Sequence, residues 1–268
     1  MKNSFLFKVI VVFAYFTIIA INFLANTLPI GGVTTGEASD ALPNLFTPAG
    51  ITFSIWGIIY LLLLGYTVYQ FNFLRRKRTL KQDALFFNTG RFFLLNAFAN
   101  IAWIFTWHYQ IIWLSVLVMF VLLYSLIRIS DMLNNRCLSF SDTVFLLIPF
   151  NVYFGWITIA TIANITAFLV SVDWGGFGIS ALTWTIVILI AGAGIGILQL
   201  YKSRSVSYGL VLVWAYFGIW LKHSSADGLD GAYPAITQTV LLCIFVFIGV
   251  LLVLTFKKIT SKTPISNS

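Results

Sequence analysis

Residues 43–60 read PNLFTPAGITFSIWGIIY, a segment that begins as a loop and continues as an apolar helix. Its prolines, of which the second is Pro48, fix φ and cannot donate a backbone hydrogen bond, so we expect a stiff lip before the helix. Phe53, Trp56 and Tyr60 follow at helical spacing and share one face. The segment therefore predicts an aromatic wall under a rigid lip, suited to a flat apolar ligand. Ordinary helix packing with interfacial tryptophans would give the same pattern.

The composition around this segment is that of a membrane protein. Of the 268 residues, 60% are hydrophobic and only 9% are charged, with a mean hydropathy of +0.95. A soluble domain has about 25% charged residues, so we predict an all-α, polytopic transmembrane bundle embedded in a lipid bilayer. The net charge of +8 arises from cations near helix ends and does not indicate a nucleic-acid partner. Cys137 and Cys243 show no metal or redox spacing.

Eight apolar segments are candidates for membrane spans, each to be compared with the roughly 20 residues that a span needs. They are residues 6–26, 51–73, 92–107, 111–130, 142–170, 178–200, 207–221 and 234–256. The third and the seventh are short, and the fifth is long enough to tilt or bend. The first is too long for the apolar region of a signal peptide, so we expect it to be a retained helix.

The basic residues predict the orientation of these spans. If both termini are cytoplasmic, Lys222 is the one basic residue that falls outside the inner segments, as the positive-inside rule requires. A span missed or added would spoil this pattern, so eight spans with both termini in the cytoplasm is the expected topology. The basic cluster at residues 75–78 would then anchor the bundle against anionic lipid headgroups. A role of the 74–91 loop in binding a regulatory partner is the alternative.

The outer loop of residues 26–50 contains no lysine or arginine. We expect its glycines at 31, 32 and 36 to make it mobile before the prolines stiffen it. At this length a loop is often a functional lid, the alternative being a surface segment without a role.

Polar residues inside two spans are candidates for a buried site. Asn96 and Asn100 lie one helical turn apart and should face the bundle, as helix–helix hydrogen bonds or as ligand contacts. In the fifth span, Trp156 and Ala160 lie on one stripe with Tyr153 before them and Asn164 beyond. Aromatic walls, one small residue and one amide suit a planar ring system with polar edges, although small-residue helix packing would use the same stripe.

Catalytic and ion-coupled chemistry lack the residues that they need. No carboxylate or basic residue lies at the centre of a span, which argues against a proton- or sodium-coupled pump. No serine, cysteine or carboxylate arrangement typical of hydrolysis is present. His108 and His223 are the two histidines, so a multi-histidine metal or haem site is not expected. We expect no metal and no required cofactor.

Three blocks of proline, aromatic and asparagine residues occur in the order and spacing of the translocator protein family (TspO/MBR, the tryptophan-rich sensory proteins), which this chain resembles over roughly residues 5–170. The blocks are Pro43-x4-Pro48-x7-Trp56-x3-Tyr60, Asn100-x-x-Trp103 and Tyr153-x-x-Trp156-x-Thr158-x-Ala160-Thr161-x-x-Asn164. The paired prolines of the family are here Thr47-Pro48, and the proline expected at the head of the fifth span falls on Val152.

The resemblance implies a bacterial inner-membrane sensor or binding protein for a tetrapyrrole-like ligand, such as a porphyrin or haem. The pocket would lie between the second, third and fifth spans under the loop of residues 43–50. The ligand-binding residues carried over are Pro48, Phe53, Trp56, Tyr60, Asn100, Trp103, Tyr153, Trp156, Ala160 and Asn164. A homodimer is implied as well. We expect no enzyme, and light- or oxygen-dependent porphyrin breakdown near the aromatic residues is the alternative that the resemblance admits.

The resemblance divides the chain into a five-helix membrane domain, residues 1–173, and three additional helices with a short tail, residues 174–268. Gly192 and Gly196 have the spacing that permits close approach of helices. Apart from bracing the bundle, this segment suggests no function, unless it completes the path of a transporter or facilitator for a small amphipathic molecule.

Overall fold

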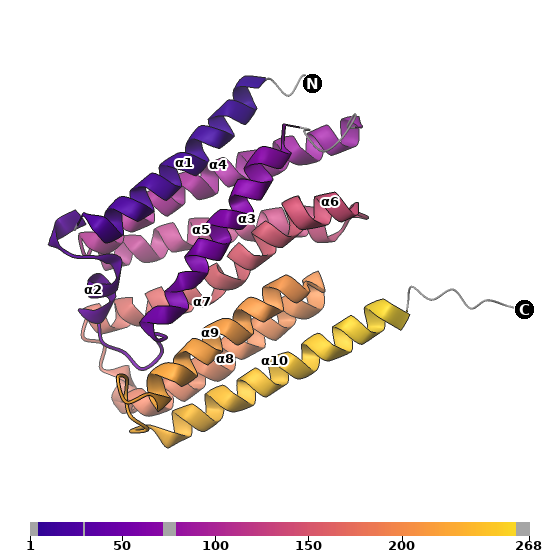
Figure 1. The fold of residues 1–268 in the computed structure, drawn as a ribbon. Coiled ribbons are helices and arrows are strands. Elements are labelled where there is room, and N and C mark those ends of the chain that lie inside the picture. The colour runs from indigo at the N-terminus through magenta and orange to yellow at the C-terminus, as the bar shows by residue number, and fades with distance from the viewer. Residues whose placement is uncertain (1–4, 29, 72–78, 261–268) are drawn as a thin grey trace, which may run out of the picture.

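Long apolar helices build this protein, and their ends are set by capping residues and by glycine- or proline-containing turns. The structure is a computed structural model that describes residues 5–28, 30–71 and 79–260. Within these residues, eight long helices lie side by side (Figure 1). They are α1 Phe5–Thr27, α3 Ile55–Tyr69, α4 Leu80–His108, α5 Ile112–Asn134, α7 Ile148–Ser171, α8 Ala181–Ser203, α9 Val206–Ser224 and α10 Pro234–Thr260.

Six of the described helical segments are long and apolar enough to cross a membrane. They are Phe5–Thr27, Gly50–Tyr69, Ile112–Asn134, Phe140–Ser171, Ala181–Ser203 and Pro234–Lys258. The predicted all-α polytopic bundle is therefore confirmed. The remaining long helices, α4 and α9, correspond to the two spans predicted as short, and both lie within the same bundle (Figure 1).

The third predicted span, residues 92–107, was too short at its start, because α4 begins at Leu80. A capping box fixes this start. Thr79 Oγ1 accepts a hydrogen bond from the Gln82 backbone N–H at 3.3 Å, and Gln82 Oε1 accepts one from the Thr79 N–H at 3.0 Å. The first turns of α4 are polar enough that hydropathy alone does not reveal them.

The fifth predicted span contains a π-helical turn near its start. Phe140–Asp142 (α6) leads into the π-helical segment Thr143–Leu147 (η3), and α7 follows with Pro149 in its first turn. The Ile148 N–H donates to the Thr143 carbonyl oxygen, so the helical run is continuous, and the π-helical turn lies directly before the position where Pro149 cannot donate a backbone hydrogen bond. Of the apolar window in this span, 72% is buried, against 22–44% in the other candidate spans, so α7 is the central helix of the fold.

Two of the last three helices, α8 and α9, pack against the central helix through glycine contacts, and α10 packs on α8 and α9. A Cβ on Gly155 of α7 would lie 2.9 Å from the backbone oxygen of Tyr208 and 2.9 Å from Cβ of Val211, both on α9. In α8, Gly192 faces Ile162 of α7, and Gly196 faces Leu212 of α9. The close approach predicted for these two glycines of α8 is thus confirmed.

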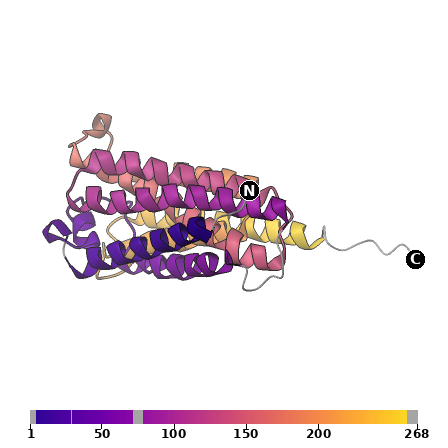
Figure 2. The same ribbon diagram turned by 90° about the horizontal axis from the view of Figure 1, so that it is seen from above.

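The Phe5 end of α1 and the Thr260 end of α10 lie at the same end of the bundle (Figures 1 and 2). The predicted outer loop lies at the opposite end. Near the end that holds the termini, Lys202 Nζ is 2.8 Å from Asp131 Oδ1. The basic cluster at residues 75–78 lies outside the described residues. The assignment of the terminal end to the cytoplasm rests on charge placement and stays a prediction.

Candidate functional site

The segment of residues 30–54, called the flap from here on, covers the end of the bundle opposite to the termini. It contains the 3₁₀ turn Ile30–Gly32 (η1), the short helix Thr35–Asp40 (α2) and the 3₁₀ turn Gly50–Ser54 (η2) that leads into α3. Gly31 and Gly32 have φ of 66° and 85°, where glycine carries no steric cost. Gly36, which was expected to loosen this loop, lies inside α2.

Two sets of side-chain hydrogen bonds fix the conformation of the flap. Thr34 caps α2, because its Oγ1 accepts from the Glu37 N–H at 3.3 Å while Glu37 Oε2 accepts from the Thr34 N–H at 2.7 Å. Asn44 Oδ1 then accepts from the backbone N–H groups of Phe46 and Thr47, at 3.0 and 2.9 Å. This side-chain turn sets the chain in front of Pro48, which precedes η2 as the sequence predicted.

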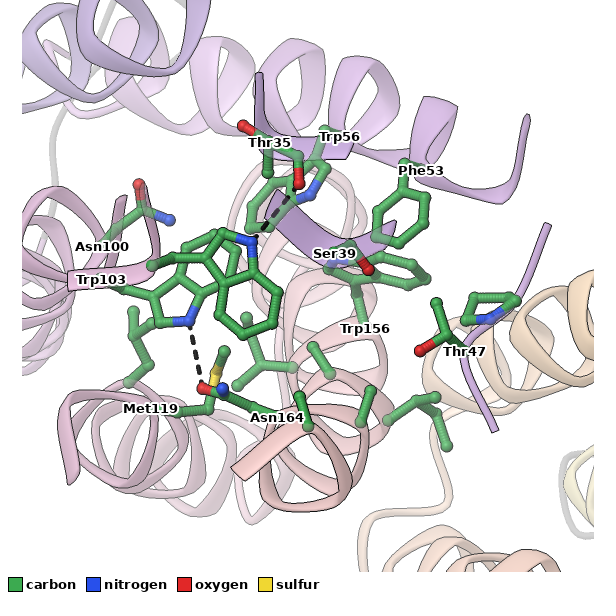
Figure 3. A pocket seen from close by; sticks show the side chains of 18 residues that line it. Thr35, Ser39, Thr47, Phe53, Trp56, Asn100, Trp103, Met119, Trp156 and Asn164 are labelled. Atoms are coloured by element: carbon green, nitrogen blue, oxygen red, sulfur yellow. Dashed lines mark hydrogen bonds between the residues drawn. The ribbon is translucent and has the colours of Figure 1, made fainter. Parts of the chain in front are cut away.

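A cavity lies under the flap, between α3, α4, α5 and α7 (Figure 3). The centre of a water-sized sphere can occupy about 60 Å³ inside it, and the wider space of about 700 Å³ between the lining atoms includes open solvent. Its lining residues are Thr35, Ser39, Thr47, Pro48, Phe53, Trp56, Asn100, Trp103, Trp107, Met119, Leu122, Trp156, Ile157, Ile159, Ala160, Ala163, Asn164 and Ala167. The lining is therefore mainly aromatic and aliphatic, with hydroxyl-bearing residues on the flap.

The aromatic walls come from three helices. The ring centroids of Trp56 and Trp156 are 6.3 Å apart with the planes at 81°, and Phe53 meets Trp156 edge-on at 5.6 Å. Trp103 and Trp107 of α4 stack at 5.6 Å on the other side of the cavity. Figure 3 shows Phe53, Trp56, Trp103 and Trp156 around one space. The separate segments thus converge, as the predicted pocket requires.

Hydrogen bonds between helices hold the polar residues of the walls. Trp103 Nε1 donates to Asn164 Oδ1 at 3.2 Å (Figure 3). Asn164 Nδ2 donates to Ser115 Oγ at 2.9 Å. Asn100 Nδ2 donates to the hydroxyl of Tyr153 at 2.9 Å and its Oδ1 accepts from Asn22 Nδ2 at 2.8 Å. These amides fix the relative positions of the helices around the cavity, and buried polar groups of this kind need such partners.

Eight of the ten residues predicted as ligand contacts line the cavity, and two do not. Tyr153 lies behind the wall, with its ring edge-on to Trp56 at 5.6 Å. Tyr60 is stacked on the same Trp56 at 5.6 Å. Both tyrosines therefore support the wall rather than forming its surface, whereas contact of the other eight with a ligand stays a prediction.

Sequence reasoning missed several lining residues. Ala163 and Ala167 extend the small-residue stripe of Ala160 at helical spacing, a signal that was readable. Met119 and Leu122 lie in a nearly uniform aliphatic helix, which gives no signal for the face that meets a cavity.

Two buried donors near the cavity have no partner in the described structure. They are Nε1 of Trp156 and the hydroxyl of Tyr60. Trp156 is itself a lining residue and is only 3% exposed. An unpaired N–H in an apolar wall is costly unless a ligand acceptor satisfies it, so this site can accept a ligand that carries an acceptor at one edge.

Both histidines have structural partners. His108 Nδ1 lies 2.7 Å from the Ile104 carbonyl oxygen, and its Nε2 lies 3.2 Å from Thr35 Oγ1. His223 Nε2 lies 2.9 Å from the Leu45 carbonyl oxygen. Neither ring lines the cavity, and among the described residues no three His, Cys, Asp or Glu side chains lie close enough to hold a metal ion.

The fold and the site together define a multi-pass α-helical membrane protein with an aromatic-lined cavity under a flap at one end of the bundle. The family model of the TSPO-like proteins matches residues 8–254, and the chain belongs to that family. The match continues past residue 170, where the three sequence blocks end, and takes in α8, α9 and most of α10. Neither the curated proteins nor the solved structures contain a match to this chain.

Proposed function

We propose that this protein is a membrane sensor or binding protein for a flat, mainly apolar ligand of the tetrapyrrole class, held in the cavity under the flap. The observation that carries the proposal is the convergence of four tryptophans on one cavity, namely Trp56, Trp103, Trp107 and Trp156. Aromatic faces and edges favour a planar ring system, and each good ring contact contributes on the order of 1 kcal/mol beyond area burial. The proposed location is the cell membrane, with both termini cytoplasmic.

The apolar and aromatic lining of the cavity supports this ligand class, and a tetrapyrrole would enter by moving the flap away from the walls, because the enclosed space is only about 60 Å³. Pockets for small molecules are mainly apolar, with a few polar groups that set the orientation. Here the apolar rings would lie between the tryptophans, and polar substituents would point towards Thr35, Ser39 and Thr47 on the flap. The unpaired Nε1 of Trp156 would donate to an acceptor on the ring edge.

Packing below the cavity favours binding over translocation. Tyr66, Phe93 and Phe150 form a cluster of fully buried rings, with centroids 4.9–6.1 Å apart. Asn96 Nδ2 donates to Ser125 Oγ at 2.9 Å at the same level of α4 and α5. The closely packed side chains in this part of the bundle support a binder, and a transporter would have to open them.

The test is a titration of the purified protein with protoporphyrin IX, followed by tryptophan quenching and by porphyrin absorbance. Removing one aromatic wall by Trp156→Ala should weaken binding by more than about tenfold, since burial and ring contacts are both lost. Because Trp156 is buried in the core, Trp56→Ala on the partly exposed wall serves as a second variant. Trp184→Ala is the matched control, since this indole in the first turn of α8 packs on Trp174 of the preceding loop, away from the cavity.

Unchanged affinity in both cavity variants, with the proteins still folded, would refute the proposed site. Proteoliposomes separate binding from transport. A binding protein saturates with porphyrin without accumulation in the lumen, whereas time-dependent accumulation would establish the transporter alternative.

A further inference from the structure

The flap is fastened to the bundle at two places, and the first is the end of α4. Trp107 Nε1 donates to the Thr35 carbonyl at 3.4 Å, and Gln110 Nε2 donates to the Ala38 carbonyl at 3.3 Å. His108 Nε2 lies 3.2 Å from Thr35 Oγ1. These contacts hold α2, the first half of the flap, over the cavity.

The second half of the flap is fastened by α9. The Ala49 N–H donates to the Gly218 carbonyl at 3.0 Å. Trp214 Nε1 donates to the Thr52 carbonyl at 3.0 Å. Near the end of α9, His223 Nε2 meets the Leu45 carbonyl at 2.9 Å, and this acceptor requires the proton on Nε2.

Close packing reinforces these hydrogen bonds at Gly218. A Cβ on this residue would overlap Oγ1 of Thr52 and would lie 2.8 Å from its Cβ. The middle of η2, at Thr52, therefore lies directly on the backbone of α9, and a larger side chain at position 218 would push it away. Further along α9, Lys222 interacts electrostatically with Asp40, which ends α2.

The three positions held by α9, Leu45, Ala49 and Thr52, lie next to three of the lining residues of the flap. Thr47 and Pro48 lie between Leu45 and Ala49, and Phe53 follows Thr52. None of the described residues of α8, α9 or α10 lines the cavity itself. The last third of the chain thus acts on the site from outside it.

We propose that Trp214, Gly218 and His223 of α9 are positioning residues of the ligand site, which hold residues 45–52 in place as one wall of the cavity. α9 is docked on the central helix at Gly155, so it offers the flap a fixed support. This inference relies on the proposed function only for its effect on the ligand, because the support of the flap is measurable without one.

The test is amide hydrogen exchange of residues 44–54 in the full-length protein, in lipid nanodiscs. Trp214→Phe removes the N–H that reaches Thr52 and keeps a ring against Phe217. The loss of one such bond should speed exchange in this segment by about fivefold. Trp184→Phe is the matched control, since it removes an equivalent indole bond, to the Gly176 carbonyl at 2.9 Å, in the outer loop between α7 and α8.

A second variant guards against misfolding of the first. His223→Phe removes the bond to Leu45 and keeps a ring against Tyr233, whose centroid lies 5.8 Å from that of His223. Both variants should also release protoporphyrin IX about fivefold faster than the wild type and Trp184→Phe, by the same loss of one bond.

Wild-type exchange in residues 44–54 of both folded variants would overturn the proposal. Faster exchange with an unchanged porphyrin release rate would also overturn it, because the support would then have no effect on the site. Absence of porphyrin binding in the wild type would refute the proposed function alone, and the exchange arm would still decide whether α9 positions the flap.

Discussion

Gly155→Ala tests the docking of the last three helices on the rest of the bundle. The added methyl would lie 2.9 Å from the Tyr208 backbone oxygen and 2.9 Å from Cβ of Val211. The Tyr208 oxygen belongs to the backbone of α9 and cannot rotate away, so α7 and α9 must separate. Overpacking of this kind costs about 1–3 kcal/mol, whereas Gly→Ala in an open helix position gains about 0.5–1 kcal/mol.

Gly194→Ala provides the matched control within α8. A Cβ at this position meets nothing within 4 Å, so only the gain in helix propensity should remain. The helix gain is common to both variants, so we expect Gly155→Ala to be less stable than Gly194→Ala by the overpacking cost, about 1–3 kcal/mol. Reversible unfolding in mixed micelles, followed by tryptophan fluorescence, gives this difference. Equal stability of the two variants would mean that α9 is not seated on Gly155, and the support inferred for the flap would lose its base.

Two other predictions concern the polar contacts of the bundle and of the flap. Asn100→Leu should destabilise the protein by about 1–2 kcal/mol, because it leaves the Tyr153 hydroxyl without its amide partner while Asn22 keeps only its bond to a backbone carbonyl. Micelle unfolding measures this loss, and a wild-type value would show that the amides contribute nothing. Hydrogen bonds from the backbone and side chain of Thr34 lower the pKa of Glu37 below that of a free glutamate. The capping contribution is therefore present in full above the pKa of a free glutamate, and it is lost as the pH falls through the lowered pKa. Glu37→Gln should preserve the protection of the α2 amides against hydrogen exchange and remove its acid sensitivity. Glu37→Ala should lose this protection already at neutral pH. Equal protection in both variants at neutral pH would contradict the capping role.

The sequence predicts the bundle well because hydropathy and charge report directly on membrane spans. It also places Phe53 and Trp56 on one helix face, and the structure turns that face towards Trp156. Helical spacing states which residues share a face but not the depth at which a neighbouring helix crosses them. For that reason Tyr60 and Tyr153, although on the predicted stripes, lie behind the cavity wall.

Other parts of the site depend on contacts that leave little trace in a single sequence. The Thr34–Glu37 capping pair indicates the start of α2, but a helix of six residues is too short to show hydrophobic periodicity. Asn22 lies near the end of an apolar helix, and its partner Asn100 follows 78 residues later. The support of the flap by α9 joins the side chains of Trp214 and His223 to backbone carbonyls and uses a glycine, so no pair of side chains marks it in the sequence.

The separation in sequence between the flap and its support has a consequence for biogenesis. Leu45 is joined to a residue 178 positions further on, and Thr52 to one 162 positions further on. Since a ribosome makes the chain from its amino end, the tryptophan-lined chamber can assemble well before α9 emerges to secure its cover. While the intervening helices are synthesised and inserted, the nascent protein therefore has the tryptophan-lined cavity, but its flap is not yet held by α9.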